Sequence, residues 1–242
     1  MITVVIPVGP HSVYKKYLPE ALESLKYQTE PPDEILIIDD MADLSVNDLW
    51  KQVNTGIVDD ILPALYYDNR GKFSIGNLSY WKCPWLSGVA HAFNYGVALS
   101  RNECVFMLGS DDRMYPTCLE ECWKEYEKQD KRDGWYNVTI VTEGGEHMSL
   151  PNNTCMVTKN LWQKTGGFPV QAALGGPDAL LLSIMLVHFP GTIFQVKEGT
   201  PLCWLREHPE QATKRDAAFY HQTVIDVRGR ETARWKKPAW TK

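Results

Sequence analysis

Apolar runs and one amphipathic segment alternate over the first 40 residues of the chain. Residues 2–8 and 34–40 are rich in valine, isoleucine and leucine, which is typical of strands buried on both faces of a parallel sheet. Between them, residues 14–28 carry three leucines at i, i+4 and i+7, which predicts a helix with one apolar stripe. Strand, helix and strand in this order form a βαβ unit with a right-handed crossover.

The same alternation continues less regularly along the rest of the chain. Predicted strands cover residues 64–67, 104–108, 137–142, 154–158, 192–196 and 201–205. Predicted helices cover residues 47–53, 89–99, 116–128, 177–188 and 216–227, and a short helix ends at Lys164. Residues 70–87 show little periodicity, and we interpret them as a long loop of the kind that often carries function. The alternation favours a single α/β domain with a C-terminal elaboration.

Composition narrows the class of protein further. With 242 residues, 44% of them hydrophobic, the chain can bury a large core and is not intrinsically disordered. A net charge of −5 argues against nucleic acid as the main partner. The last 19 residues nevertheless hold six Lys or Arg against Asp226 and Glu231. This basic tail is either a solvated end or a docking patch for an anionic partner.

Cysteine spacing and hydropathy indicate where the protein works. None of the six cysteines forms a CxxC or a zinc-type cluster, so we expect free thiols in a reducing compartment. No secretion signal is present at the N-terminus. The longest apolar run, residues 179–187, is about half of what a bilayer-spanning helix needs. We therefore expect a cytoplasmic protein without an integral membrane segment.

Two predicted strands end in acidic pairs, Asp39-Asp40 and Asp111-Asp112. Ligands of open α/β sheets bind outside the carboxyl ends of the strands. Paired carboxylates there need neutralising, and Mg²⁺ or Mn²⁺ bridging to a nucleotide diphosphate would do so. The alternative is that these aspartates cap helices and start turns. Neither GxGxxG nor GxxxxGK[ST] occurs, which disfavours the dinucleotide and P-loop classes.

Several stretches together resemble one enzyme family. They are residues 4–8 with 18–29, residues 34–40, residues 88–98, residues 106–112 and, more weakly, residues 165–168 followed by Asp178. In order and spacing they are similar to the family-2 glycosyltransferases, the inverting enzymes of the GT-A fold. The resemblance implies a Rossmann-like, mostly parallel central sheet flanked by helices. It also implies a catalytic domain over residues 1–210, with a nucleotide-sugar half (about 1–112) and an acceptor half (about 113–210), followed by a C-terminal helix and the basic tail (211–242).

Carried over position by position, the resemblance implies roles for individual residues. Asp111 would bind a divalent metal, Mn²⁺ or Mg²⁺, and Asp178 would be the general base. His208 would be a further metal ligand or contact the diphosphate, although a packing role is an equal alternative. The implied donor-binding residues are Pro7, Val8, Asp39, Asp40, Asn94, Ser110 and Asp112.

Two departures from the family pattern bear on these roles. Gly109 stands where the first acid of the metal motif is usual, and Pro177 stands where a Glu usually precedes the catalytic Asp. These two departures weaken the assignments of a metal ligand and a general base more than they weaken the assignment of the fold.

The function that follows is transfer of a sugar from a nucleotide-diphosphate donor, most commonly UDP in this family, to an acceptor hydroxyl with inversion. The alternative is a non-catalytic nucleotide-sugar or glycan-binding module of the same fold. Nucleotidyl transfer is disfavoured because residues 9–12 supply no Gly-rich loop with Arg and Lys. The acceptor stays open among glycans, lipid-linked sugars, proteins and modified nucleic-acid bases.

Overall fold

A computed structural model of the chain describes residues 1–44, 73–75, 77–83, 88–148, 152–169 and 177–211. The predicted elements at residues 47–53, 64–67 and 216–227, and all but the first residue of the segment 211–242, lie outside the described residues. No helix in these described ranges has both the length and the apolar character needed to cross a bilayer.

The described residues form twelve strands and five helices. The strands are β1 (Ile2–Val8), β2 (Glu34–Asp39), β3 (Phe73–Ile75), β4 (Leu78–Lys82), β5 (Cys104–Met107), β6 (Arg113–Met114), β7 (Trp135–Asn137), β8 (Thr139–Thr142), β9 (His147–Met148), β10 (Cys155–Thr158), β11 (Ile193–Gln195) and β12 (Pro201–Leu205). The helices are α1 (Ser12–Lys26), α3 (Val89–Leu99), α4 (Cys118–Lys128), α5 (Lys159–Thr165) and α6 (Pro177–His188).

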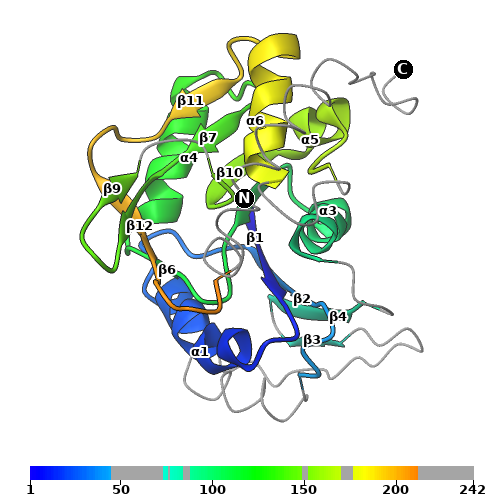
Figure 1. Cartoon of the computed structure of the whole chain (residues 1–242). Helices are drawn as coiled ribbons and strands as arrows, with labels where there is room; N and C mark the ends of the chain where they lie inside the picture. Colours follow the sequence, from blue (N-terminus) through cyan, green and yellow to red (C-terminus); the bar gives the residue numbers. More distant parts are fainter. Residues whose placement is uncertain (45–72, 76, 84–87, 149–151, 170–176, 212–242) are drawn as a thin grey trace.

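Eight strands build the central sheet, in the order β11-β7-β10-β5-β1-β2-β4-β3 (Figure 1). β1 lies between β2 and β5 and pairs with both in parallel, and β4 pairs with β2 in parallel. β10 runs antiparallel to both of its neighbours, and β3 runs antiparallel to β4. The mixed α/β fold with a mostly parallel central sheet is confirmed.

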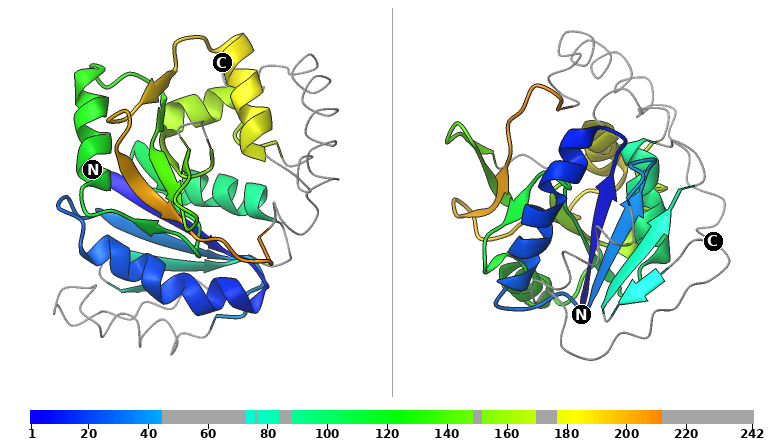
Figure 2. Two further views of the ribbon diagram at one scale, coloured as in Figure 1. Left: turned by 60° about the vertical axis from the view of Figure 1, so that its left-hand side comes forward. Right: turned by 90° about the horizontal axis from the view of Figure 1, so that it is seen from below.

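Apolar side chains cover both faces of this sheet. On one face, Val4 and Ile6 of β1 pack with α1 and α4; on the other, Val5 packs with α3, α5 and α6. Figure 1 shows these two helical layers on opposite sides of the strands, and Figure 2 shows α1 lying along the amino-terminal strands. Gly96 lets α3 come close, because a Cβ there would lie 2.2 Å from Val5 Cγ1. The unbroken apolar run of β1 is explained by burial on both sides.

Two sequence predictions about strands are wrong. Residues 70–87 are not one long loop, because β3 and β4 form a hairpin at the sheet edge in which Ile75 pairs with Leu78. Residues 137–142 are not one strand either. β7 belongs to the central sheet, whereas β8 lies in a four-stranded sheet of order β6-β12-β8-β9. The chain passes from one sheet to the other at the buried Val138.

Most other predicted elements agree with the structure to within a few residues. Four elements, β1, α3, α6 and β12, have the predicted bounds, and α1, β2, β5, α4, β10 and β11 differ from prediction only at their ends. All six cysteines are free thiols, as predicted, and all six are buried.

Candidate active site

The parallel strands bring both acidic pairs to one edge of the sheet. Val8 pairs with Asp39 across β1 and β2, and Val5 pairs with Met107 across β1 and β5. Asp39-Asp40 and the turn at residues 109–112 therefore follow strand ends that point the same way. The strand order reverses at β1, and the crevice at such a reversal is where ligands bind in open α/β sheets.

Asp39 is turned into the protein. Its side chain is fully buried, and its Oδ1 accepts a hydrogen bond from the backbone N–H of Ala42 at 2.6 Å. Its Oδ2 accepts from Leu44 N–H at 3.1 Å and from the Tyr80 hydroxyl at 2.6 Å. These bonds compensate the burial of the charge and hold the turn after β2. A carboxylate has about four lone-pair sites, so roughly one acceptor position is left for a ligand.

Asp40 ties the same edge to the next helix. Its Oδ2 accepts a hydrogen bond of 2.7 Å from the N–H of Gly88, the residue at the start of α3. Gly88 has φ of 81°, a conformation that glycine adopts without steric cost. A carboxylate at the positive end of a helix is electrostatically favourable. Asp40 therefore fixes where α3 begins relative to β2.

Asp111 and His208 meet at this edge from distant parts of the chain. His208 Nε2 lies 2.8 Å from Asp111 Oδ2, and only 7% and 14% of the two side chains are exposed. At this separation an N–H on Nε2 donates a hydrogen bond to the carboxylate, and a carboxylate oxygen and an imidazole nitrogen are also two groups that can bind a metal ion together. His208 Nδ1 is buried and has no partner among the described residues.

Arg206 fastens this acidic turn to the rest of the protein. Its backbone N–H donates to Asp112 Oδ1 at 3.1 Å, and its Nε–H donates to the carbonyl oxygen of Asp111 at 3.1 Å. Its Nη2 also pairs with Glu20 Oε2 at 2.5 Å, and its guanidinium lies 3.7 Å from the centre of the Tyr17 ring. Arg206 thus supplies positive charge beneath two carboxylates and links them to α1.

Burial sets the ionisation of Asp112. Only 5% of the residue is exposed, and desolvation together with the neighbouring Asp111 charge raises the pKa of Asp112 well above its usual value. Bonding to Arg206 opposes this shift without cancelling it. A cation beside Asp111 and Asp112 would offset the repulsion between their carboxylates and favour the ionised form of Asp112.

Gly109 is required by the packing of this turn. A Cβ at position 109 would lie 2.5 Å from Asp112 Oδ2 and 3.0 Å from Asp111 Oδ1. The two carboxylates thus fold back over the position where the family pattern has its first acid. Glycine at position 109 therefore fits the arrangement of Asp111 and Asp112 in this turn, and a larger side chain there would displace their carboxylates.

Asp178 lies in the first turn of α6 and is half-buried. Burial raises its pKa, and hydrogen bonds from the backbone N–H groups of Asp178, Ala179 and Asn153 oppose that shift. Asn153 lies just before β10, whose first residue, Cys155, pairs with Met107 at the end of β5. Asp178 is therefore at the same edge of the sheet as the acidic turn.

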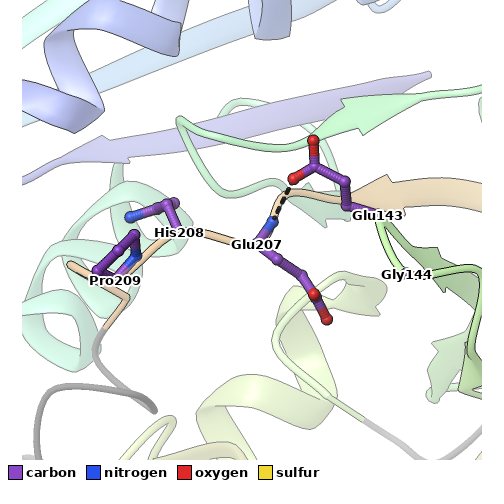
Figure 3. Close-up of a pocket in the computed structure, with 5 residues that line it drawn as sticks. All are labelled: Glu143, Gly144, Glu207, His208 and Pro209. Carbon is purple, nitrogen blue, oxygen red and sulfur yellow. Dashed lines mark hydrogen bonds between the residues drawn. The ribbon is translucent and has the colours of Figure 1, made fainter.

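An open pocket of about 610 Å³ adjoins His208. Figure 3 shows its lining: Glu143 and Gly144 come from the β8–β9 connection, and Glu207, His208 and Pro209 follow β12. The Glu207 N–H donates to Glu143 Oε2 at 3.2 Å, which joins the two sides. The pocket has the size of a small-molecule site, and its rim is acidic.

The remaining candidate donor-binding residues have different surroundings. Pro7 and Val8 are buried at the end of β1, and Ser110 is buried in the acidic turn. Asn94 uses both ends of its amide on Phe168, donating to its carbonyl oxygen and accepting from its N–H, each at 2.8 Å. No structural observation tests a donor contact for any of these four residues, and their roles stay predictions.

Sequence reasoning missed three residues of this edge. Arg206 stands in the same stretch as His208, Glu20 lies in the matched helix at residues 18–29, and Tyr80 falls in the segment interpreted as a loop. Of these three, only Arg206 had a signal in the sequence, because it stands two residues before the candidate metal ligand His208. Within the described ranges, no group of three or more His, Cys, Asp or Glu side chains is arranged as a metal-binding set.

Comparison with solved structures agrees with this architecture. S. aureus TarS superposes with a TM-score of 0.66 at 15% identity, over 95% of this chain and 39% of that protein. TarS 1–349 in complex with UDP gives 0.65 at 14% identity over 94% and 64%, and with UDP-GlcNAc 0.66 at 14% over 95% and 66%. The chain thus spans less than two thirds of the first full-length neighbour. No curated protein sequence matches significantly.

The fold and its acidic edge place the protein in the GT-A class of α/β folds. The sequence model of glycosyl transferase family 2 matches residues 3–176, which is most of the chain. The protein belongs to glycosyl transferase family 2.

Proposed function

We propose that this protein is an inverting glycosyltransferase that moves a sugar from a UDP-sugar to an acceptor hydroxyl. The observation that carries the proposal is the 2.8 Å contact between Asp111 and His208 at the edge where Asp178 also lies. Family membership supports the reaction class. The complexes of TarS with UDP and UDP-GlcNAc support the donor class.

The donor would lie across the ends of β1, β2 and β5. Pro7 and Val8 would provide the apolar floor under the base, and Asp39 and Asp40 would shape its wall through the turn and the helix that they hold. Ser110 and Asp112 would lie beside the diphosphate and the sugar. Because most of these side chains are already fixed by hydrogen bonds or burial, the donor meets a preformed site, which lowers the entropic cost of positioning it.

Asp111 and His208 are the residues that would hold a divalent metal, Mn²⁺ or Mg²⁺. The Asp111 carboxylate oxygen is the donor type that these ions prefer, and the His208 nitrogen 2.8 Å away would be a second ligand. The raised pKa of Asp112 fits the same site, because a cation would relieve the repulsion from Asp111. When bound, the metal would neutralise charge that builds on the leaving diphosphate.

Asp178 would act as the general base. The acceptor hydroxyl attacks the anomeric carbon from the face opposite the diphosphate, its proton passes to the Asp178 carboxylate, and the bond to the UDP oxygen breaks with its electron pair. The configuration at the anomeric carbon inverts in this single displacement. The raised pKa of Asp178 makes the carboxylate a stronger base than an ordinary aspartate.

The pocket beside His208 would receive the acceptor. Its lining includes His208, and Glu143 and Glu207 give it an acidic rim. Hydroxyl groups are good partners for carboxylates, which fits a sugar-like acceptor. Glycans, lipid-linked sugars, proteins and modified nucleic-acid bases all present a suitable hydroxyl or can be modified to do so.

Release of UDP from UDP-GlcNAc in the presence of Mn²⁺ tests the proposal. An enzyme releases UDP, and Asp178→Asn should bind UDP normally yet release it at least 10²-fold more slowly. A non-catalytic nucleotide-sugar-binding module would bind UDP-GlcNAc and leave it intact. Equal UDP release by the parent and Asp178→Asn would remove Asp178 from the mechanism.

A further inference from the structure

Asn94 makes an unusually complete contact with one distant residue. Its Nδ2 donates to the carbonyl oxygen of Phe168 and its Oδ1 accepts from the N–H of Phe168, both at 2.8 Å. The side chain therefore pairs with a peptide backbone as a neighbouring strand would. Aspartate in its place would keep the acceptor and lose the donor, and alanine would lose both.

Gly167 allows the chain to come this close to α3. Its φ is +74°, and a Cβ there would lie 2.4 Å from Asn94 Oδ1 and 2.6 Å from Trp162 Nε1. The N–H of Gly167 donates to the carbonyl oxygen of Trp162 at 2.9 Å, which closes the end of α5. Position 167 therefore requires glycine both for its backbone conformation and for the contact with Asn94.

The ring of Phe168 belongs to the buried cluster against which α6 packs. It lies 4.8 Å from the Trp162 ring and 5.9 Å from the Phe93 ring, measured between ring centres. Leu181 and Met185 of α6 belong to the same buried cluster. Because α6 carries Asp178 in its first turn, the placement of Phe168 bears on the placement of the candidate base.

The start of α3 is held by Asp40, on the donor side of the site. Gly88 N–H donates to Asp40 Oδ2 at 2.7 Å, six residues before Asn94 in the sequence. One helix thus connects the acidic pair after β2 to the buried cluster under α6. Because α3 is a rigid helix bonded to Asp40 at Gly88 and to Phe168 at Asn94, it fixes the distance between these two residues.

We propose that Asn94 is a positioning residue, which sets α6 and Asp178 relative to the donor edge through Phe168. The proposal rests on the function proposed above and deepens it: Asn94 would act on the chemical step, in place of the donor contact that the family resemblance implies for it. Its removal should lower turnover while leaving affinity for UDP intact.

The test compares Asn94→Ala with a matched control, Asn77→Ala. Asn77 also donates from its side chain to a backbone carbonyl, that of Pro32 at 2.9 Å, away from the acidic edge. UDP release from UDP-GlcNAc with Mn²⁺ should fall at least tenfold in kcat for Asn94→Ala, and the Kd for UDP should stay within twofold. Asn94→Asp, which sets a carboxylate oxygen against the Phe168 carbonyl oxygen, should lose at least as much turnover as Asn94→Ala. Asn77→Ala should retain parental turnover.

Two further measurements separate positioning from general destabilisation. In an Asp178→Asn background, adding Asn94→Ala should cost no more turnover, because the residue acts through Asp178. Amide hydrogen exchange at residues 166–168 and 179–185 should accelerate in Asn94→Ala and not in Asn77→Ala. A tenfold loss of UDP affinity, unchanged kcat or an additive loss in the Asp178→Asn background would overturn the proposal. If the parent itself releases no UDP, the proposed function fails, and hydrogen exchange alone decides whether Asn94 holds α6.

Discussion

Nε2 of His208 lies 2.8 Å from Oδ2 of Asp111, although the two residues are 97 positions apart. The contact closes the acidic turn after β5 with the segment after β12, and Arg206 fastens both to α1 through Glu20. The last strand of the described fold thus completes a site that begins with the first. Loss of either partner should affect ligand binding before it affects the fold.

Replacing His208 should weaken metal-dependent binding of UDP. We expect His208→Ala to raise the Kd for UDP in Mn²⁺ at least tenfold, which is about 1.4 kcal/mol, and to leave the weaker binding in EDTA unchanged. Isothermal titration calorimetry measures both. His147→Ala removes an exposed histidine on β9 and serves as the control. The same affinity for UDP in His208→Ala and parent would mean that His208 holds no metal.

Asp178 should set the acidic limb of the pH profile. Its pKa is raised above the ordinary value of 3.8, and only the ionised carboxylate accepts a proton. The kcat for UDP release should therefore fall as pH drops through this raised pKa, at a higher pH than an ordinary aspartate would give. Asp178→Asn should reduce kcat by 10²-fold or more, about the contribution of a positioned base. Asp130→Asn, at an exposed position with φ of 52° that asparagine tolerates, should change neither quantity.

Asp112→Asn should separate stability from function. The folded protein binds the Asp112 proton more tightly than the unfolded chain does, so ionisation of Asp112 at neutral pH costs stability. The variant should melt at a higher temperature than the parent at pH 7 without ligands. This advantage should shrink as pH falls and vanish below the ordinary aspartate pKa of 3.8, where both states are protonated. With Mn²⁺ and UDP the order should reverse, since the parent gains more from binding. A melting temperature below the parent's at pH 7 would contradict this account of Asp112.

Gly109→Ala should disturb the acidic turn. The new Cβ would meet Asp112 Oδ2 at 2.5 Å, so the carboxylates must move. We expect a lower melting temperature, by a few degrees for a cost of about 1 kcal/mol, together with weaker UDP binding. Gly144→Ala, whose Cβ would meet its nearest atom at 3.6 Å, is the stability control. Gly109→Asp should fare no better than Gly109→Ala, even though it restores the acid that is usual in the family.

Local sequence patterns predicted a strand correctly where both of its faces are buried. They failed where tertiary contacts determine whether a segment forms a strand and which sheet it joins. The run at residues 2–8 is apolar throughout, and burial on both faces makes it a strand. The hairpin of β3 and β4 was missed although Gly76-Asn77 separates two short apolar runs by two residues, which is a hairpin signal. The break at Val138 has no local signal, because the residues on both sides are equally suited to a strand.

The sequence indicated several residues that gather at this edge of the sheet, and it did not indicate the contacts between them. The acidic pairs at strand ends could be found from burial patterning, and the resemblance added His208 and Asp178. The Asp39 carboxylate accepts hydrogen bonds from Ala42, Leu44 and Tyr80. These bonds depend on the conformation of the turn after β2, which the sequence does not reveal. The packing of Asp112 over Gly109 likewise depends on side-chain directions that only the folded turn defines.

The most direct test of the account is a crystal structure of the protein with UDP and Mn²⁺, read from anomalous scattering of manganese. We expect one manganese peak bonded to Asp111 Oδ2 and His208 Nε2, with the diphosphate on its other side and Asp178 facing the open end of the site. UDP bound away from the ends of β1 and β5, or manganese bound without Asp111 and His208, would contradict it.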